Sequence, residues 1–225
     1  MKLRQWIGNF SSDAWSDWPE AAYKKQRYRQ RLCEVQSHFR ESLDTAPPGP
    51  IQVVSMCAGD GRDVISVLQS HPRRNDVTAW LVENNAQSFA YGLRRTANAG
   101  LQNRVTFLNE DATEYATYKD IVPSDILLVC GVWGHVPKNE RTQLVHAIAC
   151  LCKPGGAVIW TRSVLKQMAR LHEIQSRFDP STWGSARVSV TPDNKWAIVA
   201  HQHCGPARRI PERGRIFHFQ RNAGK

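Results

Sequence analysis

The chain has 225 residues and a formal net charge of +10 at pH 7, and 41% of its residues are hydrophobic. This length fits one domain with a sizeable core, and no apolar run approaches the roughly 18 residues that are needed to cross a bilayer. The N-terminus lacks the apolar centre of a secretory signal, and the six cysteines contain no CxxC pair. We therefore expect a cytoplasmic protein with reduced thiols, no metal site and no membrane segment.

The positive charge is concentrated on the two flanks of the chain. Residues 1–40 carry a net charge of +4, residues 41–161 a net charge of −2, and residues 162–225 a net charge of +8. Solvated surface charge is the simplest explanation of these basic flanks. Attraction of an anionic substrate or of nucleic acid is the alternative.

Residues 1–49 are expected to form a lid and a helix that pack on the core. Three tryptophans, Trp15 among them, lie in a polar N-terminal stretch and require burial, either by docking on the core or by covering the active-site edge. Residues 19–42 predict a long helix with a buried apolar face and a basic outer face that includes Arg31. The rigid turn TAPPGP then leads into the main domain, residues 50–225.

The stretch IQVVSMCAGDGRD, residues 51–63, predicts a buried strand, a tight glycine turn and the start of a helix over residues 62–68. This order opens a nucleotide-binding βαβ unit. Glycines let the backbone approach a ligand closely, and the first N–H groups of a helix are free to bind polar ligand atoms.

Three more apolar runs, residues 77–82, 104–109 and 125–130, predict parallel strands. They are followed by Glu83, by Asp111 with Ala112, and by Gly131. Ligands of open α/β sheets bind at the edge where such strands end. An acid about 20 positions after the glycines is placed to accept hydrogen bonds from ribose hydroxyls.

The rest of the chain alternates helices and strands. We expect helices over residues 84–99, 138–152 and 167–178, strands over residues 157–160, 187–190, 196–200 and 215–219, and a surface turn over residues 71–75.

The motifs VVSMCAGDGRD, LVEN, NEDA, DILLVCGVWGHV and CKPGGAVIWTR, in this order, resemble class I S-adenosylmethionine-dependent methyltransferases. In particular, the chain resembles a group of small uncharacterised bacterial methyltransferases with a CAGDGRD first loop. The resemblance covers residues 50–162. It implies an α/β fold: a Rossmann-like, seven-stranded, mostly parallel sheet with an antiparallel last strand, helices on both faces and an N-terminal helical lid.

The resemblance also implies the cofactor site. In the family, the first loop holds the methionine part of the cofactor, the acid after the second strand holds the ribose, and the acid after the third strand meets the adenine. The family has an acid where this chain has Ser55 and a glycine where it has Cys57, so Asp60 or Asp63 is expected to bind the amino group instead. The residues expected to bind S-adenosylmethionine, or its product S-adenosylhomocysteine, are Cys57, Ala58, Gly59, Asp60, Gly61, Asp63, Glu83, Asn84, Asp111, Ala112, Cys130 and Gly131.

The acceptor side is expected around the loop after the fourth strand. His135 titrates near neutrality, so it is the candidate base that removes a proton from the acceptor, although it could simply hold backbone in a turn. Trp133 is a candidate wall for a planar or cationic substrate. Arg162 could anchor an anionic group or form a structural ion pair. Trp15, Tyr23 and Tyr28 are candidate contacts from the N-terminal segment.

We therefore expect methyl transfer to an oxygen, nitrogen or carbon atom of a small molecule, such as a metabolite or a natural product of secondary metabolism, by a monomer or homodimer. One alternative is a nucleic-acid methyltransferase that uses the basic flanks. Another is a protein that binds the cofactor without transferring its methyl group. A dehydrogenase fits less well because its first loop would require a third glycine.

Overall fold

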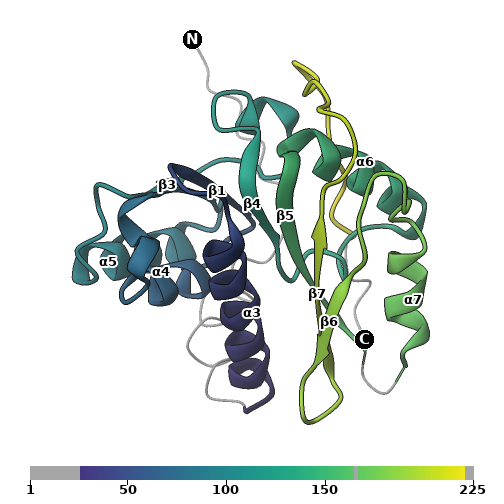
Figure 1. Cartoon of the computed structure of the whole chain (residues 1–225), viewed down its shortest axis with the longest axis horizontal. Helices are drawn as coiled ribbons and strands as arrows, with labels where there is room; N and C mark the ends of the chain where they lie inside the picture. The colour runs from purple at the N-terminus through teal and green to yellow at the C-terminus, as the bar shows by residue number, and fades with distance from the viewer. Residues whose placement is uncertain (1–25, 165–166, 221–225) are drawn as a thin grey trace.

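The computed structural model describes residues 26–164 and 167–220. A seven-stranded sheet with the order β3-β2-β1-β4-β5-β7-β6 forms its centre (Figure 1). Strands β1 to β5 run parallel to one another, whereas β7 is antiparallel to both β5 and β6. The strands are β1 (Ile51–Met56), β2 (Val77–Val82), β3 (Val105–Leu108), β4 (Ser124–Val129), β5 (Cys152–Ser163), β6 (Arg187–Val190) and β7 (Trp196–Gln202). The predicted sheet, including its antiparallel last strand, is confirmed.

Helices cover both faces of this sheet. On one face lie α3 (Gln26–Thr45), α4 (Arg62–Leu68) and α5 (Ala86–Asn98), and on the other lie α6 (Arg141–Leu151) and α7 (Ala169–Gln175) (Figure 1). The short 3₁₀ helices are η1 (Pro72–Asn75), η2 (Tyr115–Tyr118) and η3 (Lys138–Glu140). None of the helices within the described ranges is both long and apolar enough to cross a membrane.

The central strands are apolar on both faces because both faces are covered. In β4, Ile126 and Leu128 pack with the α3 and α4 side, whereas Leu127 and Val129 pack with the α6 and α7 side. A continuous apolar run, rather than an alternating one, is typical of a parallel strand that is buried in this way.

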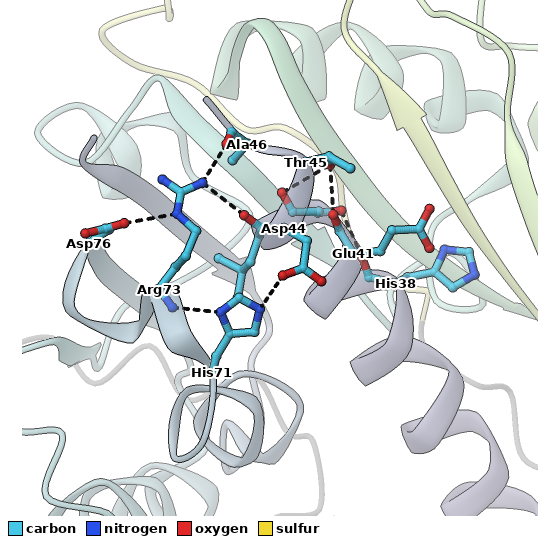
Figure 2. Close-up of polar contacts among 10 residues, drawn as sticks. His38, Glu41, Asp44, Thr45, Ala46, His71, Arg73 and Asp76 are labelled. Atoms are coloured by element: carbon cyan, nitrogen blue, oxygen red, sulfur yellow. Dashed lines mark hydrogen bonds and ion pairs between the residues drawn. The ribbon is translucent and has the colours of Figure 1, made fainter. Parts of the chain in front are cut away.

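Helix α3 is fixed to the core through the segment that the sequence predicted to be a surface turn. His71 is buried, and its Nε2 lies 3.3 Å from Asp44 Oδ1 (Figure 2). The guanidinium of Arg73 donates to four carbonyls at and beyond the end of α3, at N···O distances of 2.5–3.1 Å: those of Leu43, Ala46, Pro47 and Gly49. This arginine therefore replaces the hydrogen bonds that the last carbonyls of a helix lack.

The predicted strand over residues 215–219 is wrong. This segment forms only one isolated bridge, from Arg215 to Glu114, and no ladder in the described structure. Ile216 and Phe217 are both buried, so the apolar residues of this segment pack into the core without a strand partner.

Candidate functional site

The carboxyl ends of the parallel strands bring most of the predicted cofactor residues to one edge of the sheet. Met56 pairs with Val82, and Val82 pairs with Leu108, so the first three strands end level with one another. From β1 the chain proceeds to β2 on one side, whereas β4 lies on the other side. The crevice between β1 and β4 is therefore the switch point where ligands of open α/β sheets bind.

The first loop turns sharply through three residues with left-handed backbone torsions. Cys57, Gly59 and Gly61 have φ values of +54°, +59° and +67°. Cys57 thus adopts a conformation that favours glycine, which explains why methyltransferases of the resembling family have glycine there. Burial raises the pKa of its thiol, with smaller effects from Glu83 and Asp111. The N–H of Ala58 donates to the carbonyl of Val82 at 2.9 Å, which holds this loop against the end of β2.

Glu83 connects the first loop to the second. One carboxylate oxygen accepts a hydrogen bond from the N–H of Gly59 at 2.8 Å, and the other accepts from the N–H of Asn85 at 2.7 Å. Burial raises the pKa of Glu83, and the backbone N–H bonds oppose this shift. A carboxylate has about four acceptor positions, so further acceptor capacity remains for ligand hydroxyls. Asn84 lies beside it with an exposed side chain.

The structure distinguishes the two acids that could replace the missing one at Ser55. Asp60 is buried and forms ion pairs with Arg62 and, at 3.1 Å, with Arg95. These arginines lower the pKa of Asp60 against the opposing effect of burial. Asp63 accepts a hydrogen bond from the adjacent backbone N–H of Val64 at 3.0 Å and forms no ion pair with any described residue, and burial raises its pKa to about 6. Asp60 therefore stabilises the loop, whereas Asp63 keeps acceptor capacity.

The loop after β3 contains Asp111 and Ala112. One Asp111 oxygen accepts from the N–H and the hydroxyl of Thr113, at 2.9 and 2.7 Å. The other lies 3.7 Å from a guanidinium nitrogen of Arg215. Ala112 is buried, and its carbonyl accepts the hydroxyl of Tyr118 at 2.9 Å. These bonds fix the turn at the same edge as Glu83.

In the loop after β4, Cys130 and Gly131 are half-buried at the switch point. Gly131 has a φ of +84°, and its N–H donates to the Thr161 hydroxyl at 2.9 Å. Burial raises the pKa of Cys130 to about 12. Trp133, by contrast, is fully buried against Trp160, with ring centroids 5.6 Å apart. The prediction that Trp133 forms a substrate wall does not fit this position, because its ring belongs to the core.

His135 and Arg162 lie close together on the α6 side of the edge. Burial lowers the pKa of His135, and the positive charge of Arg162 lowers it further. A guanidinium nitrogen of Arg162 lies 3.1 Å from where a Cβ at Gly134 would stand. Arg162 forms no ion pair among the described residues, and its Nε is buried without a hydrogen-bond partner. The predicted alternative, a structural ion pair, is therefore not found there.

More positive than negative charge surrounds Arg162. Burial lowers its pKa, and Arg141 and Arg170 lower it further, while Glu173 acts in the opposite direction. Glu173 is already paired with Arg141 and, at 2.7 Å, with Arg177. This cluster of four arginines and one glutamate therefore retains uncompensated positive charge, which suits an anionic group.

The predicted position of Arg31 on the outer face of its helix is wrong. Its guanidinium carbon lies 4.8 Å from the ring centroid of Trp196. One of its nitrogens lies 3.3 Å from where a Cβ at Gly131 would stand. Tyr28 is half-buried on the same side, 6.0 Å from Trp196 between ring centroids. Residues three and four apart share a helix face, so the spacing of Tyr28, Arg31 and Val35 was the signal.

Two predicted contacts, Trp15 and Tyr23, lie outside the described residues. Within the described part of the chain, no group of three or more His, Cys, Asp or Glu residues is arranged to hold a metal ion.

Comparison with solved structures identifies this architecture. Magnesium protoporphyrin IX methyltransferase from Synechocystis PCC 6803, solved with bound S-adenosylmethionine, has a TM-score of 0.58 at 13% identity, over 77% of this chain and 80% of that one. An rRNA methylase from Streptococcus thermophilus has a TM-score of 0.54 at 12% identity, over 74% of this chain and 94% of that one. The fold is therefore that of the class I methyltransferases.

A family model described as "Putative methyltransferase" matches residues 23–172. The chain belongs to this methyltransferase family. It is also 28% identical over 137 residues to the uncharacterised protein YnbC of Escherichia coli (strain K12). That match covers 59% of this chain and 23% of YnbC, so it spans less than a quarter of that relative.

Proposed function

We propose that the protein transfers a methyl group from S-adenosylmethionine to a small, anionic acceptor. The observation that carries this proposal is Glu83, a half-buried carboxylate that joins the first and second loops beside the switch point. It retains acceptor capacity at the point where ribose hydroxyls bind in the family.

The residues at this edge fit the proposed cofactor. The left-handed torsions of Gly59 and Gly61 let the backbone turn sharply, and a Cβ at Gly59 would have nothing within 4 Å, so a ligand can approach the backbone closely there. Asp111 and Ala112 lie in the turn where adenine binds in the family, and Gly131 borders the crevice from the other side. Asp63, rather than Asp60, is our candidate for the amino group, because Asp60 is already paired with arginines.

In this proposal the acceptor binds beside Arg162, which holds an anionic group such as a carboxylate or phosphate. His135 takes the proton from the acceptor atom, and its lowered pKa keeps the imidazole neutral and able to accept at neutral pH. When bound, S-adenosylmethionine supplies an activated methyl group on its sulfonium. The protein then has to align the two reactants and exclude water.

A nucleic-acid acceptor is the second candidate, and one observation favours it. The segment after β7 is exposed and basic, with Arg208, Arg209 and Arg213 at its surface. Nucleic-acid binding through such residues would weaken steeply as salt rises, whereas binding of a small anion at Arg162 would weaken less.

The test is calorimetric titration of the protein with S-adenosylhomocysteine, with NAD as the comparison ligand. We expect S-adenosylhomocysteine to bind and NAD not to bind. Glu83→Ala should weaken the binding of S-adenosylhomocysteine by roughly 1.5–3 kcal/mol, the value of charge-assisted hydrogen bonds. Glu110→Ala is the matched control, because Glu110 is an exposed acid in the loop after β3. Equal affinity of the Glu83→Ala variant and the unmodified protein would remove Glu83 from the site, and NAD binding alone would overturn the proposal.

A further inference from the structure

Helix α3 brings a positive charge into the crevice between β1 and β4. The C-terminal end of α3 is fixed by Arg73 and His71 (Figure 2). Its middle is fixed to the edge strand β6 by a 2.9 Å contact between His38 Nε2 and the Ser189 hydroxyl. Because α3 is held along its length, Arg31 on its N-terminal half has a defined position.

The surroundings of Arg31 orient its guanidinium toward the switch point. The group lies over the Trp196 ring and against Gly131, where any side chain would come within 3.3 Å of it. Its positive charge lowers the pKa of the Cys130 thiol at the end of β4, against the larger effect of burial. Its Nε is buried without a hydrogen-bond partner. A buried guanidinium nitrogen with no acceptor is costly, so a ligand acceptor would stabilise it.

Asp63 lies in the first turn of α4, and α3 contacts this turn through a 3.0 Å hydrogen bond from Gln36 Nε2 to the carbonyl of Arg62. The charges of Asp63 and Arg31 act on each other, since Arg31 is the main electrostatic influence that lowers the pKa of Asp63 against burial. They nevertheless form no ion pair within 4.0 Å in the described structure. Asp60, the neighbouring acid, is held by Arg62 and Arg95 and does not compete for Arg31.

An α-amino acid carries a carboxylate and an ammonium group on one carbon. A guanidinium and a carboxylate that influence each other without forming an ion pair present the complementary pair of charges. Arg31 can bind a carboxylate with two parallel N–H···O bonds, and partial burial strengthens both interactions.

We propose that Arg31 and Asp63 together bind the amino-acid end of the cofactor, with Arg31 on the α-carboxylate and Asp63 on the α-ammonium. This inference rests on the proposed function and adds a residue from α3 to the cofactor site. Helix α3 then completes the binding site in addition to covering the sheet, and Arg31 is a positioning residue for the methyl donor.

Three ligands separate the contributions of the two residues in calorimetric titrations. S-adenosylhomocysteine has both charged groups, decarboxylated S-adenosylmethionine has the amine alone, and 5′-methylthioadenosine has neither. We expect Arg31→Met to lower the affinity for S-adenosylhomocysteine by about 10-fold or more, while the affinities for the other two ligands change by less than about 2-fold. Asp63→Asn should lower the affinity for the two amine-containing ligands and leave the affinity for 5′-methylthioadenosine unchanged.

Arg29→Met is the matched control, because Arg29 is exposed on the same helix. Arg31→Lys should restore part of the lost affinity, since it keeps the charge but not the two parallel bonds. If Arg31→Met lowers the affinity for all three ligands equally, Arg31 has only a structural role and the inference fails. Unchanged affinity for S-adenosylhomocysteine would also overturn the inference. If the unmodified protein binds neither S-adenosylhomocysteine nor 5′-methylthioadenosine, the proposed function itself fails.

Discussion

At the scale of single residues, two glycines with nearly the same torsion have very different surroundings. Gly61 has a φ of +67° and Gly100 a φ of +65°. A Cβ on Gly61 would lie 2.5 Å from Leu81 Cδ2 and 2.8 Å from Phe107 Cζ, whereas nothing lies within 4 Å of the corresponding position at Gly100. The first loop therefore requires glycine for space as well as for torsion.

We expect Gly61→Ala to lower the free energy of unfolding by about 3 kcal/mol, from roughly 1–2 kcal/mol of backbone strain and a further 1–3 kcal/mol of overpacking. Gly100→Ala should lower the free energy of unfolding by the backbone strain alone. Denaturant unfolding of the two variants measures the difference. Equal losses would mean that Leu81 and Phe107 move aside at no cost.

Spacing alone predicted Glu83, but it could not separate Asp60 from Asp63. The acid after the second strand follows from the order of motifs, because strand length and loop length fix its place at the sheet edge. One partner of Asp60, Arg62, is two positions away, but the other, Arg95, comes from a helix and lies 35 positions later in the chain. Contacts of this kind depend on how α4 and α5 pack, and the local sequence does not contain them.

At the scale of elements, the connection between α3 and η1 shows how one side chain can hold a helix. Arg73 also pairs with Asp76 at 3.0 Å, so its guanidinium is held on two sides (Figure 2). The segment HPRRN is polar and precedes a strand, which is typical of a turn, and the sequence analysis assigned it as one. Its partners lie more than 20 residues earlier, beyond the reach of a local pattern.

Arg73→Met should lower the free energy of unfolding by about 2–3 kcal/mol, because it leaves the carbonyls at the end of α3 without their donor. Arg74→Met is the control, since Arg74 is exposed and its side chain donates to the carbonyl of Gln69 alone among the described residues. It should change stability by no more than about 0.5 kcal/mol. Denaturant unfolding measures both variants, and hydrogen exchange would show whether α3 loses protection first. Similar stability of the two variants would mean that Arg73 does not hold the helix.

Helix α3 and the segment after β7 also show which patterns mislead. Apolar spacing located the buried face of α3 correctly, with Val35 and Phe39 in the core. The charge of Arg31 led to its wrong assignment to the outer face, because the sequence does not distinguish a partly buried arginine from a solvent-exposed one. Alternation misled the assignment of residues 215–219, because an extended chain can bury apolar residues without a partner strand.

At the scale of the whole molecule, two buried histidines couple stability to pH. His38 on α3 and His201 on β7 have pKa values lowered from 6.5 to about 4. Burial is the main cause for both, and Arg187 adds to it for His38. His201 stacks on Phe178, with ring centroids 4.3 Å apart, and its Nδ1 lies 3.4 Å from the Gly184 carbonyl. The folded protein therefore favours the neutral form of both rings.

These lowered pKa values make the folded protein less stable as the pH falls. Between pH 6.5 and about 4 the unfolded chain binds protons that the folded chain does not, so the stabilising contribution is complete above pH 6.5 and is lost as pH falls toward 4. The raised pKa values of Asp63 and Glu83 act in the opposite direction, because folding favours their protonated forms. A comparison between variants isolates one histidine from these groups.

His201→Phe keeps an aromatic ring beside Phe178 and removes the titrating nitrogen. We expect the free energy of unfolding of the unmodified protein to fall relative to that of His201→Phe by roughly 1–3 kcal/mol between pH 7 and pH 4. Urea unfolding at several pH values measures this difference. Parallel pH profiles of the two proteins would show that His201 is accommodated equally well in its charged form, and the acid sensitivity of the fold would then have to come from His38 or from carboxylate pairs such as Asp60 with Arg62.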